Sequence, residues 1–443
     1  MKKKKYFLIP LLVASIFIFT MCGQKNSDNT ASSGEENKLE ESGEKKKLVF
    51  WCHENEPWKV AYEEMGKKFS QAHPDYEVVV ESYPFDVYND KIQTALTDKS
   101  GGPDIVAVWE GMAPNFIQSD GLDRVPDELV NELEQDYLAP TLGIYRKEGT
   151  FYGVPMEFNL EYGGMITNDN MLKKAGKEVP KTWDELRKLS KELAVSKVDL
   201  VEVGGLEMLD NDSFICNYLA MILQQGGQYL NEDGSVNFAT PEGIKAMEEM
   251  LSMVDNKESG IDNLVNGEYS FNNVFQDKAY MASVGSWAIG EGEAYGKEFG
   301  KDFSYQPVPQ YGDKMAFASE TGWGLMVPAN SSEKEMAWEF IKFFSQPENL
   351  VEHNIACSQL PPRKSLLDNE KYKKEMPHIA FLLDILDKGQ WMGPYNTWTM
   401  REILNEAFIS LSSQKVEERN IEEVLKDVSK RISEEARISY RVD

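Results

Sequence analysis

From residue 47 onward the chain alternates short apolar runs with stretches of helical periodicity, and this alternation constrains the fold more than any other feature of the sequence. Apolar runs typical of buried strands occupy 47–52, 76–81 and 101–111. Between the first two, apolar side chains recur at helical spacing, at Trp58, Ala61, Met65 and Phe69. A second, mostly polar helix is expected over 86–99. This order of strands and helices predicts an α/β fold with an open, mainly parallel sheet.

The same pattern returns later in the chain. Capping signals that predict helix starts occur three times, at Thr182 with Glu185, Thr240 with Pro241, and Ser332 with Glu335. Further strands are expected at 278–287 and 322–328. No repeat and no linker interrupts the chain after residue 47, so we expect one compact α/β unit of two lobes.

The N-terminus carries an export signal. Four lysines precede an apolar run from Tyr6 to Met21, which predicts a signal peptide over 1–21. Cys22 follows at once, and the segment resembles a bacterial lipoprotein signal in which this cysteine becomes the lipidated first residue. Phe19 and Met21 depart from the usual residues before such a cysteine. The alternatives are an uncleaved anchor and an ordinary secretory cleavage, and each of them also exports the protein.

A polar segment separates the signal from the first strand. Residues 23–47 contain no aromatic and one large aliphatic residue, so we expect a disordered tether over 22–46. The whole chain has a formal net charge of −27 at pH 7. Because phosphate binding needs clustered Lys and Arg, this charge argues against nucleic acid as a partner.

Motifs for metal, cofactor or catalytic chemistry are missing from the sequence. Cys52, Cys216 and Cys357 share no close spacing, so we expect three buried free thiols, with one disulfide as the alternative. There is no G-x-S-x-G, H-E-x-x-H or phosphate-loop motif. We therefore expect no cofactor, no metal and no enzymatic activity. A secreted glycosidase is the alternative from another class, since carboxylate separation cannot be read from sequence.

Acidic and aromatic residues gather where predicted strands end. Ligands bind beyond the carboxyl ends of strands in open α/β sheets. The candidates are Glu54, Asn55, Trp109, Glu110, Glu157 and Trp287. Carboxylates and amides bond hydroxyls directionally, and indole faces give flat apolar platforms, so a polyol or a cation suits this mixture better than an anion. For a single tryptophan the alternative is core packing, and for a single glutamate it is a solvated surface carboxylate.

Four ordered blocks carry a family resemblance: "YGVPMEFNLEYGGMITNDNMLKKAGKEVPKTWDEL", "QQGGQYLNEDGSVNFATPEGIKAM", "DKAYMASVGSWAIG" and "GWGLMVPANSSEKEMAWEFIKFFSQPE". With them the chain resembles the extracellular solute-binding proteins of ABC importers, specifically the sugar-binding family that includes the maltose-binding protein. The resemblance implies a two-lobed, type II periplasmic-binding-protein-like fold, with a mainly parallel sheet flanked by helices in each lobe and a cleft between them. Lobe one would be 47–160 plus 316–356, and lobe two 161–315 plus 357–443.

The resemblance also implies a function. A protein of this kind binds a mono- or oligosaccharide outside the cytoplasmic membrane and delivers it by hinge closure to the permease subunits of an ABC importer. It would be a monomer in the periplasm or at the cell surface, anchored through a lipid at Cys22. Trp323, Tyr395 and Trp398 are also expected near the cleft. Arg363 is added from the segment "QLPPRKS", and a surface salt bridge is its alternative. The same fold binding a polyamine, a peptide or a phosphorylated polyol is the nearest alternative.

Overall fold

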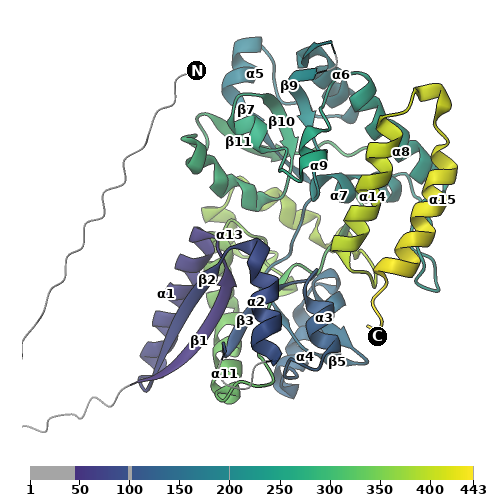
Figure 1. Cartoon of the computed structure of the whole chain (residues 1–443). Coiled ribbons are helices and arrows are strands. Elements are labelled where there is room, and N and C mark those ends of the chain that lie inside the picture. The colour runs from purple at the N-terminus through teal and green to yellow at the C-terminus, as the bar shows by residue number, and fades with distance from the viewer. Residues whose placement is uncertain (1–44, 98–101, 199, 443) are drawn as a thin grey trace, which may run out of the picture. The chain divides into compact units, whose positions relative to one another are not determined.

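The computed structural model describes residues 45–97, 102–198 and 200–442 (Figure 1). The predicted signal peptide, the predicted lipidation site at Cys22 and the predicted tether up to residue 44 lie outside the described residues. Order begins with β1 (Lys46–His53), where the first apolar run was expected to form a strand.

The first sheet has five strands in the order β2-β1-β3-β13-β6. Its strands are β1, β2 (Tyr76–Tyr83), β3 (Ile105–Trp109), β6 (Val154–Pro155) and β13 (Trp323–Met326). β1 runs parallel to β2 and β3, whereas β13 runs antiparallel to β3 and β6. Helices packed with this sheet are α1 (Glu56–Ala72), α2 (Phe85–Thr97), α11 (Lys334–Ser345) and α12 (Pro347–Ala356). We call the sheet and these helices the first lobe.

The second sheet also has five strands, in the order β11-β7-β10-β9-β8. Its strands are β7 (Gly164–Asn168), β8 (Val195–Lys197), β9 (Leu200–Glu207), β10 (Ala279–Ser283) and β11 (Phe303–Pro307). Only β9 and β10 pair in parallel; the other pairs are antiparallel. Helices associated with it are α5 (Asp169–Ala175), α6 (Trp183–Leu193), α7 (Ser213–Gln224), α8 (Pro241–Asp255), α9 (Asp262–Asn266) and α10 (Asn272–Phe275). We call this sheet with its helices the second lobe.

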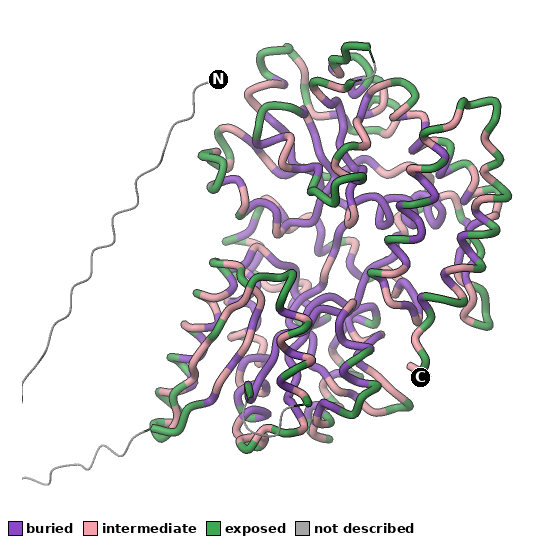
Figure 2. The backbone as a smooth tube through the Cα atoms, in the orientation of Figure 1, coloured by how far each residue is buried: buried purple, intermediate pink, exposed green. Residues whose placement is uncertain are grey.

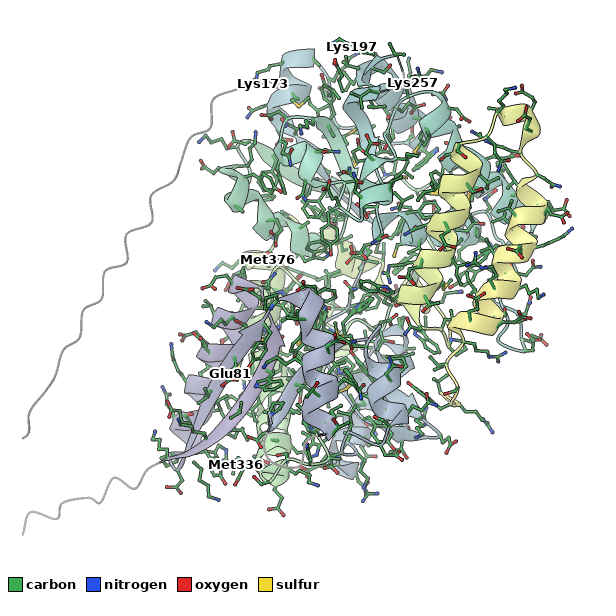
Figure 3. All side chains as sticks on the ribbon, in the orientation of Figure 1. Glu81, Lys173, Lys197, Lys257, Met336 and Met376 are labelled. Carbon is green, nitrogen blue, oxygen red and sulfur yellow. The ribbon has the colours of Figure 1, made fainter. Side chains whose placement is uncertain are left out.

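The C-terminal helices α14 (Thr397–Ser412) and α15 (Ile421–Arg431) pack beside α8, as Figure 1 shows in yellow. All twelve residues of α7 are buried, because α7 contacts α8 and α14 as well as β12 (Phe317–Ser319). In Figure 2 the burial is densest along the strands and α7, whereas the outer helices expose one side. Charged side chains such as Lys173, Lys197 and Glu81 stand on the outside of the two lobes (Figure 3).

Short elements complete the fold. The remaining helices are α3 (Ala113–Gln118), α4 (Asp127–Asp136) and α13 (Glu370–Glu375). β4 (Arg146–Lys147) pairs with β5 (Thr150–Phe151), and β12 pairs in parallel with β14 (Gly389–Trp391). The short turns of helix are η1 (Ala139–Tyr145), η2 (Ser286–Tyr295), η3 (Lys364–Leu366), η4 (Ala380–Asp384), η5 (Leu386–Lys388), η6 (Val416–Glu418) and η7 (Ile432–Ala436).

The chain passes between the two sheets more than once. Residues 156–163 join β6 of the first sheet to β7 of the second, and residues 308–322 lead from β11 back to β13. After α12 the chain stays beside the first lobe for several residues, since Leu360 bridges to Phe158 and Arg363 to Tyr137. These crossings bring polar residues of the linking segments close to the ends of β1 and β3.

Two of the three predicted helix starts are confirmed. Thr182 and Glu185 form a reciprocal capping box at α6, and Thr240 caps α8 ahead of Pro241. The capping box at Ser332 and Glu335 is wrong. α11 begins at Lys334 after Glu333, with no side-chain cap.

Ser331 explains why the third helix starts later than predicted. Its hydroxyl donates to the Asp104 carboxylate at 2.6 Å and accepts from the Glu333 backbone N–H at 3.1 Å. This tertiary contact fixes the turn before the helix, and a local capping pattern carries no information about it. The three cysteines Cys52, Cys216 and Cys357 are buried and free, as expected.

Candidate ligand-binding site

A cavity of about 500 Å³ is lined by residues of both lobes, and we call it the cleft cavity. Its walls include the ends of β1 and β3, the 156–163 and 308–322 crossings, the loop after β9, and α14. Small-molecule sites in proteins usually have volumes of ~300–1,000 Å³. Size and position therefore make the cleft cavity the candidate ligand-binding site.

Trp323 lines the cleft cavity at the start of β13 while packing on the first lobe. Its ring stacks on His53 with centroids 4.3 Å apart and meets Trp58 edge-on at 5.4 Å. Gly322, just before it, has a φ of +82°, and a Cβ there would lie 2.8 Å from Asn159. The glycine thus permits the close approach of the two crossings that brings Trp323 to the cavity.

A second aromatic group stands at the α14 end of the cavity. Trp398 of α14 is 47% exposed, and its ring lies nearly parallel to Phe85 of α2 at 6.4 Å. Trp109 at the end of β3 meets Trp398 edge-on at 6.1 Å. These rings come from α2, β3 and α14, and α14 is far from the other two in the sequence.

Trp287 lines the cavity from the second lobe. Its indole Nε1–H donates to Glu161 Oε1 at 2.7 Å, and the Gly285 backbone N–H donates to Glu161 Oε2 at 3.1 Å. Its ring also meets Tyr269 edge-on at 5.5 Å. Glu161 therefore fixes the orientation of this indole.

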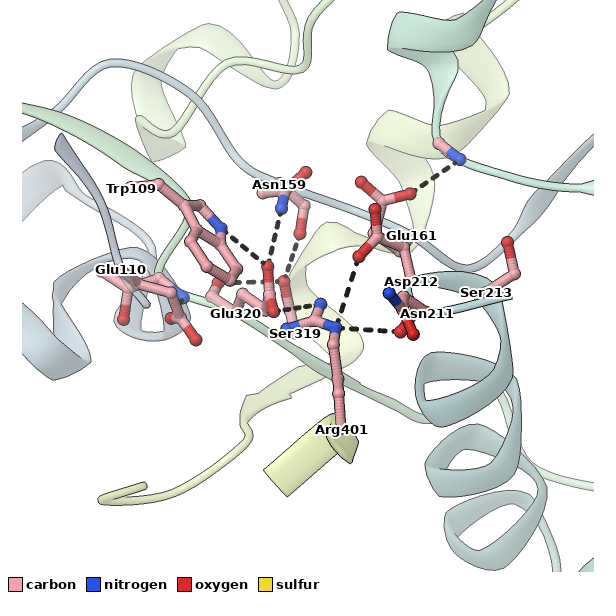
Figure 4. A network of polar contacts seen from close by, with 12 residues as sticks. Trp109, Glu110, Asn159, Glu161, Asn211, Asp212, Ser213, Ser319, Glu320 and Arg401 are labelled. Atoms are coloured by element: carbon pink, nitrogen blue, oxygen red, sulfur yellow. Dashed lines mark hydrogen bonds and ion pairs between the residues drawn. The ribbon is translucent and has the colours of Figure 1, made fainter. Parts of the chain in front are cut away.

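Glu320 and Arg401 form the centre of the polar network shown in Figure 4. Glu320 accepts hydrogen bonds from Trp109 Nε1 at 3.2 Å and Asn159 Nδ2 at 2.9 Å, and it pairs with the Arg401 guanidinium. Arg401 Nε lies 3.3 Å from the Asp212 carboxylate. The network joins β3, both crossings, the loop after β9 and α14.

One hydrogen-bond donor of this network has no partner among the described residues. Arg401 is 4% exposed and lines the cavity, yet its Nη1 has no hydrogen-bond partner within the described part of the chain. A buried, unpaired guanidinium donor is costly unless a ligand or water supplies an acceptor. A water or a ligand oxygen that reached Arg401 Nη1 would satisfy this donor.

The cavity is strongly acidic. Arg401 is the single Lys or Arg among its described lining residues, and Glu320 and Asp212 offset its charge. The lining carboxyl groups are those of Glu54, Glu157, Glu161, Asp212, Glu268, Glu291, Glu320 and Glu402. Anionic ligands would meet net repulsion here.

Burial changes the protonation of several groups at the site. It raises the pKa of Glu157 to about 8, with a further increase from the charge of Glu320, although hydrogen bonds from the Trp323 backbone and Gln359 oppose the shift. Burial likewise raises the pKa of Asp212 to about 6. It lowers the pKa of His53 to about 4, so the imidazole is neutral at pH 7. The site therefore presents neutral donors and acceptors as well as charges.

The structure brings most of the predicted site residues together. Those that line the cleft cavity are Glu54, Asn55, Trp109, Glu157, Trp287, Trp323 and Trp398. Asn55 also caps α1, because its side chain accepts from the Trp58 backbone N–H at 3.2 Å.

Three predicted residues are outside the lining. Glu110 is 2% exposed and accepts a hydrogen bond from the Thr321 backbone N–H behind the cavity. Tyr395 is buried, and its hydroxyl donates to the Gly234 carbonyl. Arg363 forms ion pairs with Asp136 at 2.6 Å and Glu132 at 3.2 Å, which is the salt-bridge alternative for such a residue.

Sequence reasoning missed Glu161, Asp212, Glu320 and Arg401. Glu161 and Glu320 lie in the blocks "EYGG" and "ETGWG", close in sequence to the predicted site residues Glu157 and Trp323. Arg401 follows Trp398 by three residues, so both lie on one side of a helix. That spacing could have indicated Arg401 as a site residue. The sequence around Asp212 contains no pattern that places it in the same polar network.

No group of three or more His, Cys, Asp or Glu side chains in this part of the chain is arranged to hold a metal ion. None of its helices combines the length and the apolar character needed to cross a membrane.

Comparison with solved structures supports the fold. The structure of maltose-bound MalE3 from T. maritima matches with a TM-score of 0.69 at 19% identity, over 87% of this chain and 98% of that chain. The predicted α/β, two-lobed, type II periplasmic-binding-protein-like fold is confirmed, but the sheets are mixed rather than mainly parallel as predicted.

Sequence comparison gives the family. The arabinooligosaccharide-binding protein of Halalkalibacterium halodurans is 22% identical over 362 residues, which cover 77% of this chain and 78% of the relative. The lactose-binding protein of Rhizobium radiobacter is 24% identical over 316 residues, covering 66% and 69%. The family model for the bacterial extracellular solute-binding protein matches residues 55–350. This chain therefore belongs to the bacterial extracellular solute-binding protein family, as its sequence blocks predicted.

Proposed function

We propose that the protein binds a neutral carbohydrate outside the cytoplasmic membrane and delivers it to the permease of an ABC importer. The observation that carries the proposal is the cleft cavity, in which indole rings stand beside buried hydrogen-bonding groups. Sugars have apolar faces that stack on indoles and hydroxyls that bond carboxylates, amides and guanidinium groups.

Specific groups are free for hydroxyl binding. Arg401 Nη1 and the His53 Nδ1 have no hydrogen-bond partner among the described residues. Asn159, which lines the cavity, donates its Nδ2 to Glu320, and this leaves the amide oxygen as an acceptor. A neutral imidazole, an amide and a charged donor together can distinguish donor and acceptor hydroxyls.

Charge favours a neutral ligand over a phosphorylated polyol. Because Glu320 and Asp212 already offset Arg401, the lining has no free cation for a phosphate. The two relatives described above are named for the neutral sugars arabinooligosaccharide and lactose, whereas another relative, at 22% identity, is named for sn-glycerol-3-phosphate, so the charge of the lining carries this choice. A polyamine would tolerate the acidic lining, so it belongs in any ligand screen.

Delivery would follow from hinge closure. The cavity takes its lining from both lobes, so a ligand that contacts both stabilises the closed arrangement. The residues expected to contact ligand are Glu54, Asn55, Trp109, Glu157, Trp287, Trp323, Trp398 and Arg401. Glu110, Tyr395 and Arg363 would act only indirectly, since they do not line the cavity.

The proposed location follows from the N-terminal sequence. We propose that Cys22 is lipidated after removal of residues 1–21, which would hold a monomer at the outer face of the membrane. Mass spectrometry of the protein from its native host should find a diacylglyceryl group on Cys22. An unmodified N-terminus at another residue would contradict the anchor without affecting sugar binding.

A thermal-shift screen tests the ligand class. A sugar at about 100 times its Kd should stabilise the folded protein by about 2.7 kcal/mol, since it binds only the native state. A shift with a polyamine, a peptide or glycerol phosphate, and none with any sugar, would refute the proposal. Release of shorter sugars during the incubation would instead identify a glycosidase.

A further inference from the structure

The C-terminal segment runs from the second lobe back to the first, and we call residues 437–442 the C-terminal strap (Figure 1). It follows η7, beyond the helices α14 and α15 that pack beside α8 of the second lobe. Terminal segments are usually poorly ordered unless specific contacts hold them. The contacts of the strap therefore show which parts of the molecule it connects.

At its start the strap pairs with the segment that leads into α14. Backbone hydrogen bonds of 2.7 and 3.0 Å join 436–438 to 394–396, on either side of an antiparallel bridge between Tyr395 and Arg437. The first turn of α14 follows directly, and it carries Trp398 into the lining of the cleft cavity. The strap is thus joined to the end of α14 that forms a wall of the site.

The other end of the strap binds η1 and the β4–β5 hairpin. Tyr440 is 8% exposed, and its hydroxyl donates to the Ile144 carbonyl of η1 at 3.1 Å. The Arg441 carbonyl accepts from the Glu148 backbone N–H, between β4 and β5, at 2.8 Å. In Figure 1 the yellow chain that leaves α15 accordingly ends beside β5.

η1 connects the strap to the first lobe and to the back of the cleft. The hydroxyl of Tyr145 in η1 donates to a carbonyl of β3 at 2.9 Å. The Ile144 backbone N–H donates to the Thr321 hydroxyl at 3.0 Å, in the crossing that returns to β13. Thr321 directly follows Glu320, which pairs with Arg401. A continuous chain of contacts therefore leads from the strap to the ion pair of the cleft cavity.

We infer that the C-terminal strap sets the angle between the lobes at the α14 side of the cleft, and that Tyr440 is a positioning residue for Trp398 and Arg401. α14 packs on the second lobe, yet its first turn must stand against the first lobe for Trp398 to stack with Phe85. The same placement brings Arg401 to Glu320. Without the strap, the lobes would sample more arrangements, and a smaller fraction of molecules would have this wall assembled.

Double electron–electron resonance on spin-labelled protein tests the inference without any ligand. Labels on Val87→Cys of α2 and Val265→Cys of α9 report the distance between the lobes, and both residues are exposed, at 48% and 54%. Cys22→Ser in every sample avoids a third label, since the other three cysteines are buried. The parent with these labels should give one narrow distance distribution.

Two variants release the strap to different degrees. A chain that ends at Ser439 loses both contacts with the first lobe and keeps the pairing with 394–396, whereas Tyr440→Phe loses only the hydroxyl. The truncation should broaden the distance distribution, and Tyr440→Phe should broaden it less. Tyr218→Phe is the matched control, because the Tyr218 hydroxyl donates to the Gly243 carbonyl at 3.2 Å within the second lobe. It should lower stability and leave the distribution unchanged.

Sugar affinity gives the second readout. Maltotriose, lactose and arabinotriose would be titrated by calorimetry into the parent, the truncated chain and the control. A sugar that the parent binds should bind the truncated chain about fivefold more weakly or worse, because apparent affinity falls with the fraction of competent molecules. The control should bind like the parent.

The two readouts separate the inference from the proposed function. A distance distribution that the truncation leaves unchanged, or that Tyr218→Phe broadens equally, would overturn the inference whatever the sugars do. A broader distribution with unchanged affinity would overturn the positioning role of Tyr440. A parent that binds none of the three sugars would count against the proposed function, and the distance measurement would still decide whether the strap sets the lobe angle.

Discussion

Trp323 has two roles that a single substitution can separate. The ring packs on His53 and Trp58, yet it also lines the cleft cavity. We expect Trp323→Ala to weaken sugar binding by about tenfold or more, because it removes a stacking face. The same change should lower the stability of the free protein by about 3–5 kcal/mol. Titration calorimetry and urea unfolding measure the two effects.

Trp338 supplies the matched control for Trp323. It is similarly buried, with 7% exposure against 9% for Trp323, and its Nε1–H bonds Asp123 away from the cavity. Trp338→Ala should lower stability and leave affinity unchanged. If Trp323→Ala behaves in the same way, Trp323 is a core residue only.

Arg401 is the second residue whose role can be resolved by substitution. Arg401→Met would leave the Glu320 carboxylate buried and unpaired, so it should destabilise the protein by about 3–5 kcal/mol. The double variant Arg401→Met with Glu320→Gln removes that unpaired charge and should recover much of the stability in urea unfolding.

Ligand affinity then decides whether Nη1 contacts the sugar. The double variant should still bind at least about tenfold more weakly, because the lost donor cannot be replaced by a thioether. Stability and affinity that recover together would mean that Arg401 serves the fold alone.

At the scale of elements, the residue that caps the N-terminus of α1 also belongs to the candidate ligand-binding site. The Asn55 side chain accepts a hydrogen bond from the Trp58 backbone N–H and also lines the cleft cavity. Asn55→Ala should cost about 1 kcal/mol through the lost cap, whereas Asn55→Asp keeps the cap and should cost almost nothing. Thermal unfolding of the two variants measures this difference.

Binding by the same variants shows whether the amide contacts ligand. Asn55→Asp replaces a donor by a carboxylate, so it should weaken sugar binding even though α1 is intact. An unchanged affinity would restrict Asn55 to capping. The comparison is clean because capping needs only the side-chain oxygen, which both residues have.

The elements also show how far sequence reasoning reaches. The strands near 47–52 and 76–81 and the caps at Thr182 and Thr240 were predictable, because periodicity and capping are local. The start of α11 was not, since Ser331 is held by Asp104 from a distant strand end. The ion pairs of Arg363 were not predictable for a related reason, because its acidic partners lie on α4, far away in the sequence.

At the scale of the whole molecule, buried carboxyl groups make folding depend on pH. The pKa of Glu157 is raised to about 8 in the folded protein, mainly by burial, from an ordinary value of 4.5. The folded state therefore binds more protons than the unfolded state between these values, so stability falls as pH rises from about 5 to about 9. The slope is at most about 1.4 kcal/mol per pH unit for one group.

Glu157→Gln tests this dependence. The amide mimics the protonated carboxyl and does not titrate. The free energy of unfolding of the variant should therefore fall less steeply as pH rises, and the variant should be more stable than the parent at pH 9. Urea unfolding at pH 6 and pH 9 measures both proteins. A decline of equal steepness in the variant would assign the pH dependence to other groups, such as Glu110, whose pKa burial also raises to about 8.

The sequence by itself determined the α/β class, the family and the rows of acidic and aromatic residues at strand ends. These follow from hydrophobic periodicity, ordered blocks and composition, all of which are properties of neighbouring residues. Only the tertiary structure decided which of those residues share a cavity, because the cleft forms where crossings far apart in the sequence meet. Arg401 shows the reason: its charge is balanced by Glu320 and Asp212, which come from two other segments of the chain.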